Sequence, residues 1–137
     1  MSVVLSKKQL DELRKIDTPT LCNAIEPLNV RAHTVGFMGM DVSCLFPEKG
    51  VMLGYAVTAT LDTMTADRVH DKSKAMEFFK AVEDAPKPVV IVLKDIGPRK
   101  SHSCHFGEVM ASVTRGLGAI GLVTDGGVRD LAAVRSL

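Results

Sequence analysis

The chain has 137 residues, of which 46% are hydrophobic, 24% charged and 4% aromatic, and this length suits about one globular domain. The composition excludes a coiled coil, a collagen or a disordered tail as the main structure. Seventeen basic and sixteen acidic side chains give a formal charge of +1, and no basic run is long enough to follow a phosphate backbone. We therefore expect no nucleic-acid partner.

The sequence also argues against a membrane or secreted protein. Its longest apolar runs, such as residues 89–93, are far shorter than the ~20 residues that span a bilayer, and its N-terminus is not signal-like. Cys22, Cys44 and Cys104 are too few and too scattered for a disulfide framework, so reduced thiols are expected. These features predict a cytoplasmic protein with no membrane partner.

Residues 6–26 are predicted to form two helices with a break between them. Apolar side chains recur at helical spacing on both sides of the break. Pro19 fits only the first turn of a helix, and Asp17 or Thr18 before it offers a capping oxygen, so the second helix is predicted to begin there. Residues 27–50 hold many turn residues and no sustained period, which predicts a loop with short strands.

Strands and helices are predicted to alternate along the rest of the chain. The run 89–93 is apolar and β-branched, as in strands that are buried on both faces of a parallel sheet. The charged run from Asp67 to Lys72 is predicted to be a solvated approach to a helix. This alternation predicts an α/β fold, whose ligands bind outside the carboxyl ends of the strands. The strands are predicted at residues 54–61, 89–93 and 119–124, and the helices at 72–82, 107–115 and from Arg129 onward.

Polar residues that follow these strands form the candidate site. Glu108 begins a predicted helix, where the free backbone N–H groups of Val109 and Met110 favour an anion such as a substrate carboxylate. Arg129 can bind the same carboxylate, or an enolate oxygen, through its planar guanidinium fork. The structural alternative for Glu108 is a simple interaction with the helix dipole.

Asp130 supplies an oxygen ligand of the kind that hard divalent cations prefer. Glu108 or Asp95 would orient the waters of such a cation, because Mg²⁺ keeps several waters when it is bound. The structural alternative is that Arg129 and Asp130 form an ordinary surface ion pair. It is the combination of a helix start, a guanidinium and a carboxylate that favours a functional site.

The combined motifs resemble the RraA-like family, which includes the 4-hydroxy-4-methyl-2-oxoglutarate aldolases and the regulators of ribonuclease E activity. The matching segments are DTPTLCNAI at residues 17–25, GYAVT at residues 54–58, and the acidic residue Glu108 followed after twenty residues by Arg129-Asp130. The resemblance covers nearly the whole chain. It implies a single α/β domain over residues 1–137, with the RraA-like layered β/β/α (swivelling) fold and without the C-terminal portion of the family domain.

The resemblance also implies a role for each charged residue of the site. In aldolase members the Asp of the Arg-Asp pair, here Asp130, ligates Mg²⁺ or Mn²⁺. The Arg, here Arg129, contacts pyruvate and stabilises its enolate. The preceding acidic residue, here Glu108, is commonly Asp and holds a metal-bound water, so that Arg129 and Glu108 are the implied catalytic residues.

The substrate-binding set implied by the resemblance is Gly107, Val109, Met110 and Arg129, with the backbone of Val109 and Met110 cradling the pyruvyl carboxylate. The implied reaction is class II retro-aldol cleavage of 4-hydroxy-4-methyl-2-oxoglutarate-type 2-keto acids to pyruvate. The same enolate serves oxaloacetate decarboxylation. The expected partners are this small 2-keto acid and further copies of the chain in a homotrimer or hexamer, with active sites between subunits.

Two other interpretations stay open at the level of sequence. The chain can instead be a non-catalytic RraA-like regulator that binds a ribonuclease or another protein, which needs only an exposed patch. It can also be a shortened member with neither activity. Family members run longer, and aldolases take a further acidic residue from the C-terminal region of a neighbouring subunit, a region that this chain does not contain.

Two further motifs are predicted not to bind ligands. Residues 116–121 spell G-x-G-x-x-G, but they follow a predicted helix and precede a strand, the reverse of the order in dinucleotide-binding sites. Their glycines are predicted to end the helix. His102, Cys104 and His105 lie close together, yet zinc needs further convergent ligands, so a loop rim near the mouth of the substrate site is predicted there.

Overall fold

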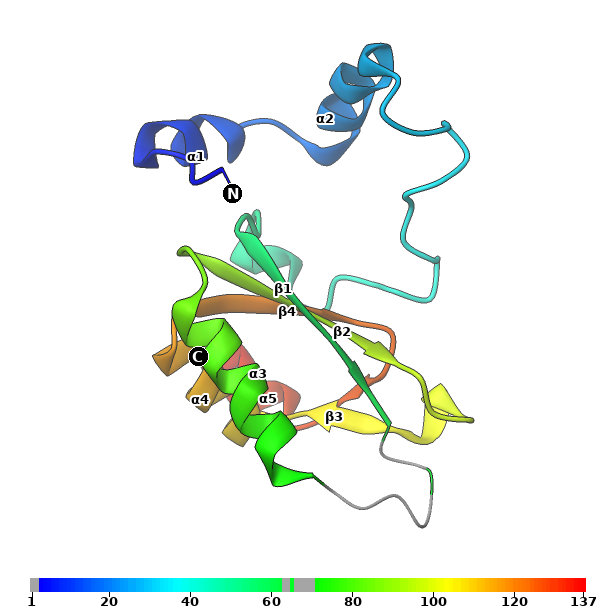
Figure 1. Cartoon of the computed structure of the whole chain (residues 1–137), viewed down its shortest axis with the longest axis vertical. Coiled ribbons are helices and arrows are strands. Elements are labelled where there is room, and N and C mark those ends of the chain that lie inside the picture. The colour runs from blue at the N-terminus through cyan, green and yellow to red at the C-terminus, as the bar shows by residue number, and fades with distance from the viewer. Residues whose placement is uncertain (1–2, 63–64, 66–70) are drawn as a thin grey trace. The chain divides into compact units, whose positions relative to one another are not determined.

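The computed structural model describes residues 3–62, 65 and 71–137, and the chain divides into two compact units, Met1–Ser43 and Cys44–Leu137 (Figure 1). Most of the charged run predicted as a helix approach lies outside the described residues, which include only Asp71 and Lys72 of it. None of the described helices combines the length and the apolar character that a membrane span needs.

The first unit contains the two helices predicted on either side of a break. Helix α1 spans Lys7–Leu13 and is capped by Ser6, and helix α2 spans Thr18–Ile25. Asp17 caps α2 by accepting a 2.7 Å hydrogen bond from a backbone N–H in the first turn, where Pro19 also lies. The prediction of two helices that are separated near Asp17 is confirmed.

The segment that follows α2 is a loop, as predicted, but the predicted short strands are wrong for residues 27–50. Its regular structure consists of two 3-10 turns, η1 (Glu26–Leu28) and η2 (Pro47–Lys49). Asn29 and Gly36 have positive φ angles of 48° and 91°, which turn the backbone out of the extended region that a strand requires. Isolated β-prone residues between such turns do not form a ladder.

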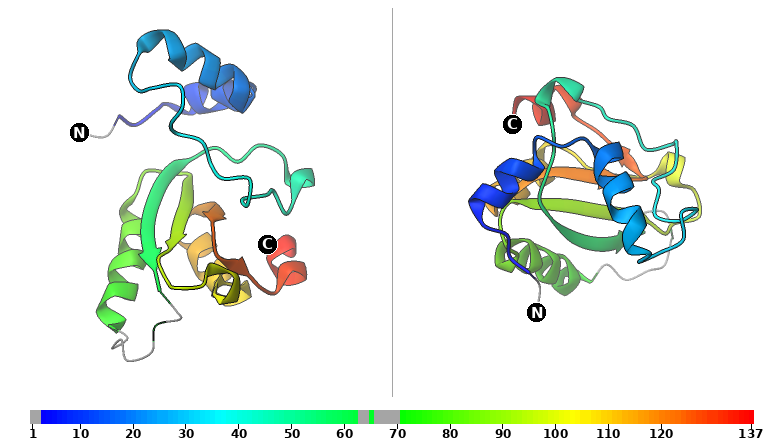
Figure 2. Two further views of the ribbon diagram at one scale, coloured as in Figure 1. Left: turned by 90° about the vertical axis from the view of Figure 1, so that its right-hand side faces the viewer. Right: turned by 90° about the horizontal axis from the view of Figure 1, so that it is seen from above.

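The second unit is built on a parallel sheet with the strand order β1-β2-β4. Strand β1 spans Tyr55–Leu61, β2 spans Val89–Asp95 and β4 spans Ala119–Thr124, which confirms the three predicted strands. Helices α3 (Lys72–Asp84) and α4 (Glu108–Gly116) lie in the two crossovers between these strands (Figures 1 and 2). This unit is a mixed α/β fold, as the alternation of elements predicts.

The core lies between this sheet and its helices. Val89, Ile91 and Leu93 alternate along β2 and are almost completely buried. Val82 of α3 and Ala111 of α4 belong to the same buried cluster, so both helices cover the same face of the sheet. The alternate side chains of β1 are exposed on the opposite face. The sheet is thus packed on one side by the helices that connect its strands.

A second sheet of two short parallel strands carries the candidate site. Strand β3 spans Cys104–Phe106 and β5 spans Gly127–Val128. Neither is predicted from the sequence, because two or three residues show no hydrophobic period. The final helix, α5, spans Leu131–Ser136 instead of starting at Arg129. Arg129 and Asp130 therefore lie in the connection between β5 and α5.

The glycine-rich segment 116–121 runs from the end of α4 into β4, the helix-to-strand order that the sequence predicts. Gly118 has a φ angle of +97°, a conformation that L side chains rarely adopt. It lies directly after the C-cap of α4. Gly116 and Gly118 therefore end the helix and turn the chain into the next strand, as predicted, whereas Gly121 lies within β4.

Candidate functional site

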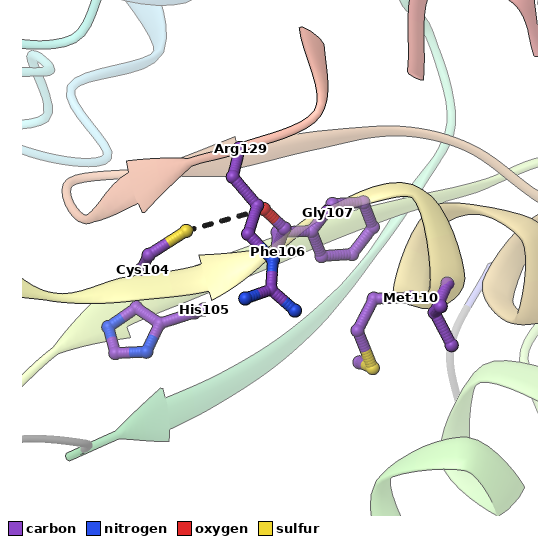
Figure 3. A pocket seen from close by; sticks show the side chains of 7 residues that line it. Cys104, His105, Phe106, Gly107, Met110 and Arg129 are labelled. Atoms are coloured by element: carbon purple, nitrogen blue, oxygen red, sulfur yellow. Dashed lines mark hydrogen bonds between the residues drawn. The ribbon is translucent and has the colours of Figure 1, made fainter. Parts of the chain in front are cut away.

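A pocket of about 50 Å³ lies where β3, the start of α4 and the end of β5 meet. Figure 3 shows that the side chain of Arg129 extends into this pocket. The wall combines this guanidinium with apolar side chains and with backbone of the loop between β3 and α4. The lining residues are Cys104, His105, Phe106, Gly107, Val109, Met110 and Arg129.

The start of α4 supplies backbone donors at this pocket. Glu108 is the first residue of the helix, as predicted, and its backbone N–H donates a 3.2 Å hydrogen bond to Oδ2 of Asp130. The N–H groups of Val109 and Met110 lie in the first turn, where helix geometry offers no carbonyl partner. The Glu108 carboxylate is exposed and accepts a 3.2 Å hydrogen bond from Ser112 on the next turn. Free N–H groups at a helix start attract an anion.

Gly107 allows the two segments of the site to approach each other closely. A Cβ atom at this position would lie 2.6 Å from Oδ2 of Asp130 and 2.8 Å from Cγ of Arg129, closer than real Cβ contacts come. Any side chain would therefore push the β5–α5 connection away from the helix start. The requirement for glycine here comes from this close approach and not from its φ angle, because the backbone is extended.

Arg129 and Asp130 reach the site from the β5–α5 connection. The backbone N–H of Arg129 donates a 2.9 Å hydrogen bond to the carbonyl of Phe106, which continues the pairing of β5 with β3. Nε of Arg129 lies 3.5 Å from Oδ2 of Asp130, with side chains 72% and 47% exposed, so the ion pair that the structural alternative predicts is present and open to solvent. Asp130 has a left-handed backbone, with φ 57° and ψ 38°.

The structure brings together the six residues that the sequence predicts for the site. Gly107, Val109, Met110 and Arg129 line the pocket, and Glu108 and Asp130 are joined by a hydrogen bond at its edge. Their functional roles stay predictions. Among the other lining residues, Cys104 and His105 occupy the predicted rim, which is a strand rather than a loop, whereas sequence reasoning missed Phe106. Its position two residues before the helix start was the available signal.

Asp95 does not take part in this arrangement, contrary to the alternative in which it orients the waters of a cation. Its side chain is 0% exposed, and both carboxylate oxygens are already used. Oδ1 accepts a 2.6 Å hydrogen bond from the N–H of Gly97, and Oδ2 accepts the hydroxyl hydrogen bond of Ser103 and lies 2.8 Å from Nε2 of His105. The burial of Asp95 could not be predicted from the sequence, because its partners lie in the irregular segment after β2, which folds back onto the strand end.

Asp95 and Asp125 form a polar network at the carboxyl ends of β2 and β4. Oδ1 of Asp125 accepts a 2.7 Å hydrogen bond from the N–H of Asp95, and Oδ2 lies 2.5 Å from Nζ of Lys100. The Ser103 hydroxyl is the main group that lowers the pKa of Asp95, and Lys100 is the main group that lowers the pKa of Asp125. Both carboxylates are therefore stabilised in the ionised form.

The donor set around Asp130 fits a divalent cation that keeps most of its waters. Both contacts of its carboxylate with other described residues involve Oδ2, and Asp is a hard oxygen ligand. Among the described residues, no three His, Cys, Asp or Glu side chains converge as a complete ligand set. The described segment with His102, Cys104 and His105 forms no such ligand set either. Mg²⁺ and Mn²⁺ are commonly held by one or two carboxylates and water, which matches what the site offers.

The fold and the site define an α/β protein in which a helix start, an arginine and an aspartate surround a small pocket beyond the carboxyl edge of a parallel sheet. The profile of the RraA-like family, described as Aldolase/RraA, matches residues 18–137. The chain belongs to the RraA-like family. No curated protein matches the sequence significantly.

A solved structure has a similar fold. It is described as Streptomyces coelicolor RraAS2, an unusual member of the RNase ES inhibitor RraA protein family. The two structures superpose with a TM-score of 0.57 at 21% sequence identity, and the match covers 96% of this chain. The chain spans 60% of the length of that protein. At this identity the similarity establishes the fold, which is that of the RraA family.

Proposed function

We propose that the chain is a divalent-metal-dependent lyase that cleaves 4-hydroxy-4-methyl-2-oxoglutarate-type 2-keto acids to pyruvate and also decarboxylates oxaloacetate. The observation that carries the proposal is the convergence of Arg129 and Asp130 on the start of α4, where Gly107 lets the two segments meet. This convergence places an anion site and a guanidinium in one open pocket, with a hard oxygen ligand at its edge.

Different residues of the pocket would bind different groups of the 2-keto acid. The free N–H groups of Val109 and Met110 would hold the carboxylate of the 2-keto acid. The guanidinium of Arg129 would bind the adjacent oxo group, and its attraction strengthens when that oxygen becomes an enolate. Because this interaction is stronger in the transition state than with the bound substrate, it would accelerate the reaction as well as bind the substrate.

Asp130 would hold the metal ion, and Mg²⁺ or Mn²⁺ there would supply Lewis-acid polarisation of the 2-keto acid. Glu108, exposed on the first turn of α4, would relay the proton of the 4-hydroxyl group through a water. Loss of that proton lets the C3–C4 bond break, which leaves its electron pair in the enolate of the first pyruvate and forms the keto group of the second. Return of the proton to C3 completes the first pyruvate.

The test is pyruvate release from 4-hydroxy-4-methyl-2-oxoglutarate and from oxaloacetate, measured with Mg²⁺, Mn²⁺ or EDTA on protein of known oligomeric state. We expect release that needs a metal and that EDTA stops. Free metal ions decarboxylate oxaloacetate slowly, so the matched control is the same mixture with heat-denatured protein. No release above that control from a folded homo-oligomer would overturn the proposal.

A second candidate is a protein-binding regulator, and the specific observation in its favour is the similar solved structure, whose description names an RNase ES inhibitor family. In this case the chain would bind an endoribonuclease of that type and reduce its cleavage rate. The test adds the purified chain to such a ribonuclease and a labelled RNA substrate. Inhibition that persists with Asp130→Asn would favour the regulator, because protein contact does not need the metal ligand.

A further inference from the structure

His105 is held differently from its neighbours on β3. Successive side chains of a strand point to opposite faces, so His105 points away from the side chains of Cys104 and Phe106. Its imidazole is 0% exposed, whereas Cys104 is exposed. The imidazole of His105 is therefore buried, and it contacts the carboxylate at the end of β2.

The ring meets a carboxylate that is ionised and already well bonded. Nε2 of His105 lies 2.8 Å from Oδ2 of Asp95, which also accepts the Ser103 hydroxyl. An ionised carboxylate only accepts hydrogen bonds, so Nε2 must carry a proton and donate it. The charged groups of this network are Asp95 on β2, Asp125 after β4 and Lys100, which lies 2.5 Å from Asp125.

The other ring nitrogen, Nδ1, is buried and has no hydrogen-bond partner among the described residues. The geometry therefore places a proton on Nε2, the ring nitrogen that faces Asp95. With this proton, one hydrogen bond joins the middle of β3 to the end of β2.

This hydrogen bond holds β3, whose three residues line the pocket of the candidate site. The residue after His105, Phe106, accepts the backbone hydrogen bond of Arg129. The next residue is Gly107, whose close approach sets the distance between the helix start and Asp130. A shift of β3 away from Asp95 would therefore disturb both the contact with Arg129 and the spacing between the helix start and Asp130.

We propose that His105 is a positioning residue of this site, which holds β3 on Asp95 through its Nε2–H group and thereby sets the geometry of the pocket. It does not touch the ligand, since its ring is inaccessible. The positioning of β3 is independent of the proposed function, whereas its consequence for pyruvate binding rests on that function.

The test uses two variants of the full chain, one that keeps a hydrogen-bond donor at this position and one that removes it. His105→Gln can place an N–H donor near the position of Nε2, whereas His105→Phe keeps the ring and removes the donor. The matched controls are His102→Gln and His102→Phe, because His102 is an exposed neighbour that is not part of the network. Hydrogen exchange of the Arg129 amide reports on the position of β3, and saturation with pyruvate reports on the pocket.

We expect His105→Phe to speed exchange of the Arg129 amide and to weaken pyruvate binding, each by about tenfold, as for the loss of one charge-assisted hydrogen bond. His105→Gln should restore both to within about twofold, and exchange of the β2 amides should change less than that of Arg129. Equal behaviour of the Gln and Phe variants, or wild-type exchange in the Phe variant, would overturn the proposal.

A second measurement uses the ring nitrogens of the wild-type protein. It tests the proposal even if His105→Phe does not fold. Nitrogen NMR distinguishes a protonated from an unprotonated ring nitrogen. We expect a protonated Nε2 for His105, and an unprotonated Nε2 would overturn the proposal. If the wild type binds no pyruvate, hydrogen exchange and NMR still test the positioning of β3. Failure of the proposed function can therefore be distinguished from failure of the proposal for His105.

Discussion

Arg129 and Asp130 are neighbours in sequence, but they offer different chemistry to the pocket. Arg129 extends its guanidinium into the cavity, while Asp130 turns its carboxylate to the N–H of Glu108. A ligand that uses both must therefore lie across the start of α4. This division of contacts allows the two residues to be tested separately.

We predict that Asp130→Asn removes metal-dependent pyruvate release and leaves the fold intact. Asn tolerates the left-handed backbone and keeps an oxygen that can accept the hydrogen bond of Glu108, so only the charge is lost. Arg129→Lys should retain metal binding and weaken pyruvate binding by at least about tenfold, because an ammonium cannot bind in a bidentate fork. Calorimetry with Mn²⁺ and with pyruvate separates the two effects.

The exposed Arg115, at the end of α4, gives the matched control as Arg115→Lys. This change should alter neither metal nor pyruvate binding. Normal turnover by Asp130→Asn would remove Asp130 from the site, and unchanged pyruvate affinity in Arg129→Lys would remove Arg129.

At the scale of elements, the carboxyl end of β2 is the point where the sheet and the site are joined. Asp95 ends the strand and holds β3 through His105, and Asp125 ties the end of β4 to the same point. Buried polar networks of this kind stabilise a structure only while every member keeps its partner. Their contribution should therefore depend on the ionisation of the two aspartates.

We predict that acid weakens the second unit through Asp95. The pKa of this carboxyl is lowered from 3.8 in the folded protein, mainly by the Ser103 hydroxyl. A group with a lowered folded pKa contributes stability above the unfolded value, and this contribution is lost as the pH falls through the folded pKa. Asp95→Asn should therefore be less stable than the wild type at pH 7, with a difference that narrows below about pH 4.

The measurement is urea unfolding of both proteins at pH 7, 5, 4 and 3. Asp41→Asn, an exposed aspartate in the first unit, serves as the control. A difference between Asp95→Asn and the wild type that stays constant over this range would contradict the prediction.

The elements also show which parts of the molecule the sequence can predict. The strands at 55–61, 89–95 and 119–124 have enough residues to display a pattern, and helix α2 is marked by Asp17 and Pro19. Strands β3 and β5 are too short to display one. They form because Ser103 and Phe106 meet backbone N–H groups from residues more than twenty positions later. Such distant pairing leaves no local pattern.

The same reasoning explains the outcome at the candidate site. Gly107, Glu108 and Arg129-Asp130 could be predicted together because a helix start and a spaced charged pair are visible in the sequence. The burial of Asp95 and the contact of His105 with it could not, because a carboxylate at a strand end looks the same whether it faces solvent or a histidine. Only the packed structure distinguishes them.

At the scale of the whole molecule, the two units differ in how they bury their side chains. All the buried hydrophobic residues of the described chain, from Val82 to Ala119, lie in the second unit. Helices α1 and α2 of the first unit have seven and eight residues and bury none of them. Helices of this length are marginal in water without tertiary packing.

We therefore predict that residues 44–137 fold without the first unit and that residues 1–43 do not fold alone. The larger fragment should unfold cooperatively in urea and retain the native exchange protection of β2. The smaller fragment should show weak helical circular dichroism that declines gradually with temperature. An unfolded 44–137 fragment beside a folded full chain would show that the second unit depends on the first.

The left-handed backbone of Asp130 has a consequence for the divergence of related sequences. Asp130 adopts this conformation, which costs a residue with a Cβ atom about 1 kcal/mol or more. Among such residues, asparagine and aspartate tolerate it best. Drift toward glycine at this position would relieve that strain while it removes the carboxylate. Under the proposed function, a relative with glycine here would keep the fold and lose the metal ligand, so the residue at this position would distinguish relatives that can bind the metal from those that cannot.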